Sequence, residues 1–383
     1  MTVTLAAPAG SGSKGFFKGT HRACTPEETW ARIAPLLAAA GVTRVGELTR
    51  LDVLGIPTAQ AVRPASRTVA VTLGAALTPT HARVCAAMAA LELWHAERMD
   101  TPPHWSAVAE VRATLGYNPY ALPLRTPHLL NDGMVLDWVP ARLLDSGRST
   151  LVPRACVECD LTLRDEWSPP LFAQTSAGVA AGNTHAEAVL HALYEVLARD
   201  AVAASRALPA EQRVRVDVDG VDSDDARRLL DRLAAAGLRV TVFDATGRTG
   251  VPCFEVVTES RSPRLVARGA ACHLDRSVAL CRALAAAARE RMALVTGVRD
   301  DLPVAVDRGD RDTEAPPAEG PRRAWSAIPS HGTASFAGDV ADIGNRLRRD
   351  GAGPALVVDL ERPEVGLPVV RVVVPGLRHT DGA

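Results

Sequence analysis

The segment AGVAAGNTHAEAVLHALYEVLARDA, residues 177–201, has apolar side chains at every third or fourth position. This spacing predicts an amphipathic helix, which we place at about 184–207 because Pro209 follows it. Asn183 lies directly before the pattern and is expected to cap the helix. An apolar helix face must be buried, so the segment predicts a helix packed on another layer of structure.

Two other segments show the same periodicity. TPTHARVCAAMAALELWHAERM at 78–99 predicts a helix over 79–98, and HLDRSVALCRALAAAARERMALVTGVRDDL at 273–302 predicts one over about 275–294. Shorter helices are expected after Thr25, which is followed by Pro26 at the first helical position, and near the C-terminus.

Short β-branched runs separate these helices. Residues 213–271 are typical of a strand, a helix and two strands, and PALVVDL and LPVVRVVVPG close the chain as two more strands. Strands and helices joined by short connections predict an α+β fold with mixed or antiparallel sheets. We expect a core in which one sheet is covered by the three apolar helices.

Two segments lack the composition of a packed core. Residues 1–15 are rich in Gly, Ser and Ala and are expected to form a flexible tail. Residues 307–323 contain no large apolar side chain and predict a mobile loop. Because no sharp break in composition divides the rest, a single domain is predicted over residues 16–378.

The charge balance limits the classes of partner. Forty-three basic and 44 acidic residues give a formal net charge of −1, which argues against electrostatic binding to nucleic acid or to a membrane surface. The first residues have no signal-peptide pattern, and no later apolar run approaches 18 residues, so a cytoplasmic protein is expected.

The seven cysteines do not form a disulfide or zinc pattern. Their number is odd and their spacing is irregular. Cys156 and Cys159 form a lone CxxC, but a structural zinc site needs four ligands and no second pair is suitably placed. We interpret them as reduced, partly buried thiols and assign no metal.

The three helical segments, together with further motifs in the same order, resemble the YcaO family. The resemblance extends over about residues 14–378. The other motifs that carry it are ELWHAE, DWVPARLL, LVPRA, GVRDD and VVDLERPEVGLPVVRVVVPGL. Members of this family use ATP to modify peptide backbone amides, and their products include azolines, thioamides and amidines in ribosomally made peptides.

That chemistry has a physical requirement. A nucleoside triphosphate brings about four negative charges, which Mg²⁺ neutralises through carboxylates spaced three or four residues apart on helices that face one pocket. The loss of one carboxylate weakens such a site, and the loss of several abolishes it.

Compared with the family pattern, this chain has lost polar side chains on all three helices and in the preceding strand. Among the altered positions are Ala75, Ala89, Ala198, Ala286 and Arg289, and Cys85, Leu93, Ala177 and Arg378 also depart from the pattern. At the first four the family has a lysine or a glutamate, and at the fifth a glutamine. An arginine at position 289 could pair with Glu92 or Glu195 and take the place of the metal.

Five polar residues of the family pattern remain, and we assign them as candidate cofactor-binding residues. They are Glu92, Asn183, Glu187, Glu195 and Arg291. Each glutamate also fits a solvated helix face, and Arg291 could pair with a neighbouring acid such as Asp300. No catalytic residue is assigned.

These observations predict a YcaO-like protein whose ATP site is degenerate. If ATP and Mg²⁺ bind, they are expected to bind weakly. The favoured function is a non-catalytic subunit that binds a precursor or leader peptide, or an intact YcaO-like or accessory protein, with a homodimer also possible. The alternative is an active ATP-dependent amide-modifying enzyme, either an azoline cyclodehydratase or a thioamide synthetase.

Overall fold

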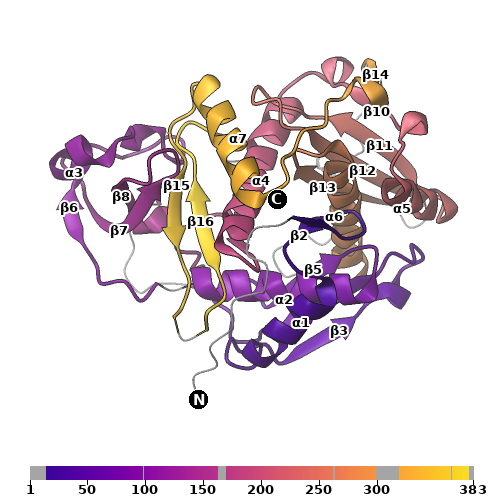
Figure 1. The fold of residues 1–383 in the computed structure, drawn as a ribbon, viewed down its shortest axis with the longest axis horizontal. Helices are drawn as coiled ribbons and strands as arrows, with labels where there is room; N and C mark the ends of the chain where they lie inside the picture. Colours follow the sequence, from indigo (N-terminus) through magenta and orange to yellow (C-terminus); the bar gives the residue numbers. More distant parts are fainter. Residues whose placement is uncertain are drawn as a thin grey trace.

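The computed structural model describes residues 14–97, 99–162, 170–261, 264–298, 319–363 and 365–378. It confirms the predicted α+β class, with mixed and antiparallel sheets packed against long helices (Figure 1). Within this part of the chain, no helix combines the length and the apolar character that crossing a bilayer requires.

A five-stranded sheet forms one side of the molecule. Its order is β13-β12-β11-β10-β14, and neighbouring strands are antiparallel except for β10 and β14, which run parallel. The strands are β10 (Arg215–Asp217), β11 (Arg239–Asp244), β12 (Cys253–Arg261), β13 (Arg264–Cys272) and β14 (Arg322–Ala324). The long helix α6 (Arg276–Thr296) packs on β12 and β13, and α5 (Asp224–Ala235) packs on α6.

A second, antiparallel sheet lies on the other side of helix α4 (His185–Arg206), which is at the centre of the molecule (Figure 1). Its order is β6-β7-β15-β16-β9, with β8 also paired to β7. The strands are β6 (Trp105–Ala107), β7 (Val135–Leu143), β8 (Ser149–Pro153), β9 (Val179–Ala181), β15 (Leu356–Asp359) and β16 (Val369–Val373). Helix α4 contacts β16 of this sheet and β13 of the other, and α7 (Phe336–Arg349) packs on α4.

The N-terminal part adds a three-stranded antiparallel sheet and a hairpin. The sheet contains β3 (Arg44–Glu47), β4 (Thr58–Val62) and β5 (Val71–Ala75), and helix α2 (Pro79–Ala96) covers it. Helix α1 (Pro26–Ile33) packs on α2 and begins after Thr25, whose side chain accepts a hydrogen bond from the amide of Glu28 as expected of an N-cap. The hairpin pairs β1 (Gly15–Phe16) with β2 (His21–Arg22).

The predicted helices are present, but two expectations about the core and the cap were wrong. The three apolar helices do not share one sheet, because α2 covers the three-stranded sheet while α4 lies between the other two. Thr184, not Asn183, caps α4: its side chain accepts a hydrogen bond from the amide of Glu187. Helix α3 (Val108–Leu115) and strand β13 were not predicted.

The two segments predicted to be unpacked fall mainly outside the described residues. This holds for residues 1–13 of the expected tail and for 307–318 of the expected loop. At their edges the structure differs from the prediction: Gly15 belongs to β1, and Arg322 begins β14.

Two glycines allow helices to lie directly on strands. A Cβ at Gly74 on β5 would be 2.4 Å from the carbonyl oxygen of Ala82 in α2. A Cβ at Gly269 on β13 would be 2.1 Å from the amide nitrogen of Ala287 in α6. A larger residue at either position would push the helix away from its strand, so glycine sets the short distance between helix and strand in both places.

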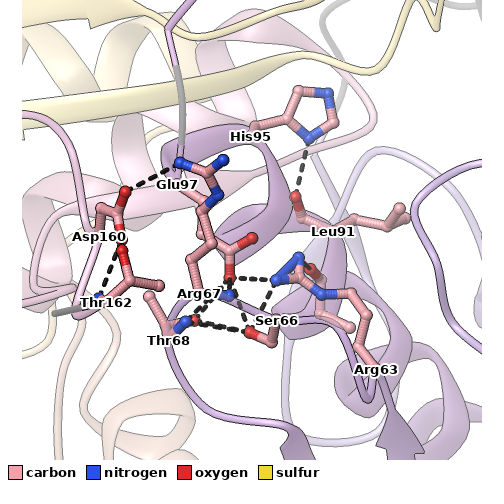
Figure 2. A network of polar contacts seen from close by, with 10 residues as sticks. Arg63, Ser66, Arg67, Thr68, Leu91, His95, Glu97, Asp160 and Thr162 are labelled. Carbon is pink, nitrogen blue, oxygen red and sulfur yellow. Dashed lines mark hydrogen bonds and ion pairs between the residues drawn. The ribbon is translucent and has the colours of Figure 1, made fainter. Parts of the chain in front are cut away.

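A buried polar network holds the C-terminal end of α2 against the loop after β4 (Figure 2). The carboxylate of Glu97 accepts hydrogen bonds from the Ser66 hydroxyl at 2.7 Å, from the Arg67 amide at 2.9 Å and from the Thr68 hydroxyl at 2.9 Å. The same oxygen pairs with the guanidinium of Arg63. Because Glu97 is only 6% exposed, this network is buried, and it fixes the end of α2.

Candidate functional site

Helices α2, α4 and α6 and the β1–β2 hairpin surround a cavity of about 230 Å³. Each helix contributes one face to it. On α2 these residues are His81, Cys85, Ala89 and Glu92, on α4 they are Glu187, His191, Glu195 and Ala198, and on α6 they are Arg282, Ala286 and Arg289. The spacings of three or four residues place each set on one side of its helix.

The four predicted residues Glu92, Asn183, Glu187 and Glu195 all line this cavity. Glu187, at the start of α4, is 3% exposed. Its carboxylate accepts hydrogen bonds from the amide of Ala23 at 3.1 Å and of Asn183 at 3.3 Å. Its second oxygen lies 3.7 Å from the Nε of Arg22.

Asn183 is buried, and its side-chain amide forms hydrogen bonds with residues of α1. Its Oδ1 accepts a hydrogen bond from the guanidinium of Arg32 at 3.0 Å, and its Nδ2 donates to the Thr29 hydroxyl at 3.1 Å. These contacts join α1 to the loop before α4. The amide therefore holds α1 against the start of α4 at the edge of the cavity.

Glu92 and Glu195 face each other from α2 and α4. Glu92 accepts a hydrogen bond from the Ala181 amide at 2.9 Å, and Glu195 accepts one from the Gly178 amide at 3.1 Å. Burial, with a smaller effect of the Glu195 charge, raises the pKa of Glu92 to about 8. Glu92 is therefore mostly protonated and neutral at pH 7.

Arg291 does not join the other four predicted residues. Its guanidinium donates to both carboxylate oxygens of Asp52, at 2.8 and 3.2 Å, and to the Ser260 hydroxyl at 3.0 Å. It is not among the residues that line the cavity. The partner suggested from the sequence, Asp300, lies outside the described residues. Arg291 thus links α6 to the segment before β4, and this bidentate pair leaves it little capacity for a cofactor.

Five of the positions expected to depart from the family pattern line the same cavity as the candidate acids, and Cys85 does too, whereas Leu93, Ala177 and Arg378 do not. The five are Ala75, Ala89, Ala198, Ala286 and Arg289. The suggested pairing of Arg289 is not found, since it forms no ion pair with Glu92 or Glu195, both of which the structure describes. The side chain of Arg289 is exposed at the cavity edge.

The cavity residues that the sequence did not indicate include four basic side chains, Lys18, Arg22, His191 and Arg282. For two of them a signal was present. His191 lies four residues after Glu187 on the same helix face, and Arg282 lies four residues before Ala286. The two hairpin residues lie more than 150 positions from α4 in sequence, so no local pattern could have placed them.

Cys85 lies beside these cations on α2. Burial raises the pKa of its thiol, but His81, Arg22 and Arg282 together outweigh burial and lower it to about 7. The thiol therefore differs from Cys156, whose pKa burial raises strongly, and from Cys281, whose pKa burial raises to about 12. Cys156 and Cys159 are both free and buried.

The carboxylates that remain do not suit Mg²⁺. Among the described residues, no group of three or more His, Cys, Asp or Glu side chains is arranged to hold a metal ion. Mg²⁺ requires near-octahedral oxygen ligands. Here Glu187 lies beside Arg22, and the carboxylates of Glu92 and Glu195 accept hydrogen bonds from the amides of Ala181 and Gly178. The donor set therefore does not fit the metal.

Comparisons with known proteins agree with this architecture. A family model described as YcaO cyclodehydratase, ATP- and Mg²⁺-binding, matches residues 73–378. An uncharacterized protein of Mycobacterium tuberculosis is 39% identical over 94% of this chain and 83% of its own length. An uncharacterized protein of Methanothermobacter thermautotrophicus is 34% identical over 93% of this chain and 94% of its own length.

Solved structures share the fold at lower sequence identity. A YcaO protein from Methanopyrus kandleri, bound with AMPPCP and Mg²⁺, has a TM-score of 0.76 at 22% identity, covering 95% of this chain and 94% of that one. A heterocyclase in complex with substrate and cofactor has a TM-score of 0.79 at 22% identity and covers 98% of this chain. This chain spans only 55% of that heterocyclase.

Proposed function

Because the chain belongs to the YcaO family, we propose that it is a non-catalytic member acting in the modification of ribosomally made peptides. In that role it binds the leader peptide of the substrate or an intact YcaO-like or accessory partner. The observation that carries the proposal is the composition of the cavity. Five positions where the family has polar side chains suited to a nucleotide and metal hold four alanines and an arginine, and all five line one cavity.

The chemistry explains why these losses matter together. Phosphorylation of an amide oxygen needs a triphosphate whose charge is neutralised and whose γ-phosphoryl group is oriented. The retained acids serve other partners, because Glu187 pairs with Arg22 and Glu195 holds the Gly178 amide. We infer that such a cavity does not assemble a metal centre.

The alternative is an active ATP-dependent enzyme that modifies peptide backbone amides, either an azoline cyclodehydratase or a thioamide synthetase. It is favoured by the shared location of Glu92, Asn183, Glu187 and Glu195 in one cavity. The Methanopyrus relative, which is bound with AMPPCP and Mg²⁺, has the same fold. The two functions differ in whether the cavity binds MgATP tightly enough for turnover.

Calorimetric titration with MgATP tests the proposal. We expect a dissociation constant at least about 100-fold higher than that of the Methanopyrus protein measured in parallel. Each lost charge-assisted hydrogen bond contributes about 1.5–3 kcal/mol, so the loss of two accounts for this factor. A low-micromolar dissociation constant accompanied by ADP formation would support the alternative instead.

A genetic experiment separates a binding role from a catalytic one. The chain would be deleted from its host and replaced by wild type or by the Glu187→Gln/Glu195→Gln variant, and peptides would be compared by mass spectrometry. We expect deletion to abolish a peptide modification that the variant still supports. Loss of the modification in a normally folded variant would show that the cavity takes part in the chemistry.

A further inference from the structure

The cavity carries more positive than negative charge. Lys18, Arg22, Arg282 and Arg289 line it and face three glutamates, of which Glu92 is mostly neutral at pH 7. Only Arg22 is paired, with Glu187. Among the residues that the structure describes, no carboxylate lies within ion-pair distance of the other three cations. The cavity therefore presents uncompensated positive charge.

Arg282 is the most confined of these cations. Its guanidinium donates to Nε2 of His191, which is a neutral acceptor because burial, followed by the charge of Arg282, lowers the histidine pKa well below its usual value. Burial and the nearby Arg22 lower the pKa of Arg282 to about 10, so it remains charged at pH 7. Glu195 lies close enough to offset part of this shift but forms no ion pair with Arg282, and a partly buried charge without a direct partner is costly unless an anion binds it.

The hairpin brings a second unpaired cation to the cavity. The turn between β1 and β2 is closed by backbone hydrogen bonds between Phe17 and Thr20, at 2.8 and 3.3 Å. Within it Lys18 has φ +37°, in the left-handed region that disfavours a residue with a side chain. This strained backbone lies where the ammonium group of Lys18 is held beside the cavity.

The volume indicates the size of the ligand. A cavity of about 230 Å³ is smaller than the roughly 300–1,000 Å³ of pockets that hold drug-sized molecules. It suits one or two phosphate groups. Guanidinium groups are the preferred partners of phosphate because they offer paired donors in one plane.

We propose that this cavity binds a phosphate or polyphosphate anion without a divalent metal ion, using Arg282, Lys18 and Arg22. The inference rests on the proposed loss of the metal site and deepens it, because the same substitutions that remove Mg²⁺ ligands leave the cations uncompensated. The anion is either free (pyro)phosphate or the phosphate chain of a nucleotide.

The test is calorimetry with phosphate, pyrophosphate and ATP, each in EDTA and each again with excess Mg²⁺. We expect pyrophosphate or ATP to bind in EDTA and Mg²⁺ to weaken that binding, because the metal neutralises the charge that the arginines recognise. Tighter binding of ATP than of pyrophosphate assigns the anion to a nucleotide, and equal binding assigns it to free polyphosphate; both support the proposal.

Variants locate the site. Arg282→Gln should weaken anion binding at least about tenfold, the loss of one charge-assisted hydrogen bond. Arg282→Lys should recover part of it. Arg50→Gln, which changes an exposed arginine that does not line the cavity, should leave binding unchanged.

If Arg282→Gln does not fold, alkylation of wild-type Cys85 gives an independent measurement. Bound anion offsets the charges of Arg22 and Arg282 that lower the thiol pKa, and should slow its reaction with iodoacetamide at pH 7. No binding in EDTA by any of the three anions overturns this inference but leaves the non-catalytic role standing. Binding that requires Mg²⁺ and yields ADP overturns both.

Discussion

At the scale of single residues, the surroundings of Cys85 lower the pKa of its thiol and should make it react faster than the other cysteines. A thiolate reacts with alkylating agents and a thiol does not. With a pKa of about 7, Cys85 should react with iodoacetamide about tenfold faster at pH 8 than at pH 6, because the ionised fraction rises through the pKa. Mass mapping of the labelled peptides measures the rate for each cysteine.

The other cysteines provide the comparison within the same molecule. Burial raises the pKa of Cys156 and Cys281, so both should stay unlabelled over this pH range in the folded protein. Cys85→Ser should remove the fast-reacting site. Labelling of Cys85 that begins only near pH 9 would contradict the lowered pKa.

Arg291 shows how a residue retained from the family pattern can serve the scaffold. The sequence placed it beside the other site candidates, but its guanidinium is held by Asp52, 239 positions away, and by Ser260. Such a pairing depends on how the segment before β4 packs on α6. No pattern along the helix contains that information.

At the scale of elements, the end of helix α2 depends on one buried carboxylate. Glu97→Ala should lower the free energy of unfolding by about 3–5 kcal/mol, because it leaves Arg63 buried without its partner. Urea denaturation followed by circular dichroism measures the change. Asp132→Ala removes the exposed pair with Arg112 and should cost about 0–1 kcal/mol. Equal effects of the two substitutions would mean that the network in Figure 2 does not stabilise the helix end.

Reintroducing the family's polar side chains on the cavity helices and on β5 should restore MgATP binding only when all of them are changed together. We expect the five-fold variant Ala75→Lys, Ala89→Glu, Ala198→Glu, Ala286→Glu, Arg289→Gln to bind MgATP measurably, because these positions line one cavity with the retained glutamates. Each single reversion should have little effect, since a partly built metal site leaves charges uncompensated.

The same variant should also reverse the effect of the metal. Wild type should bind polyphosphate less well when Mg²⁺ is added, and the restored protein should bind it better. Calorimetry on wild type, each single reversion and the combined variant provides the comparison. A combined variant that folds normally but binds no better than wild type would mean that the alanines are ordinary helix surface.

At the scale of the whole molecule, we expect cooperative folding without nucleotide. The alanines are good helix formers, so they support the helices that surround the cavity. Helix α4 contacts both large sheets, so the parts on either side of it cannot separate without exposing its apolar face. Heating should give a single sharp transition by circular dichroism. Strong binding of ANS at room temperature would indicate a molten state and contradict this.

The sequence by itself determined the three long helices and the fold class. Apolar spacing located α2, α4 and α6, because a helix that buries one face needs apolar residues at every third or fourth position. Family motifs also pointed to four glutamate and asparagine residues that line one cavity. The capping side chain of Thr25, followed by Pro26, located the start of α1.

Tertiary structure decided which side chains meet. Short strands such as β6, β9 and β14 have three residues each, too few for a periodic signal, and exist because neighbouring strands supply their hydrogen bonds. The cations of the cavity come from a hairpin and from α6, which are distant in sequence from the acids that they face. Charge compensation depends on distances in space, and only the folded chain fixes those distances.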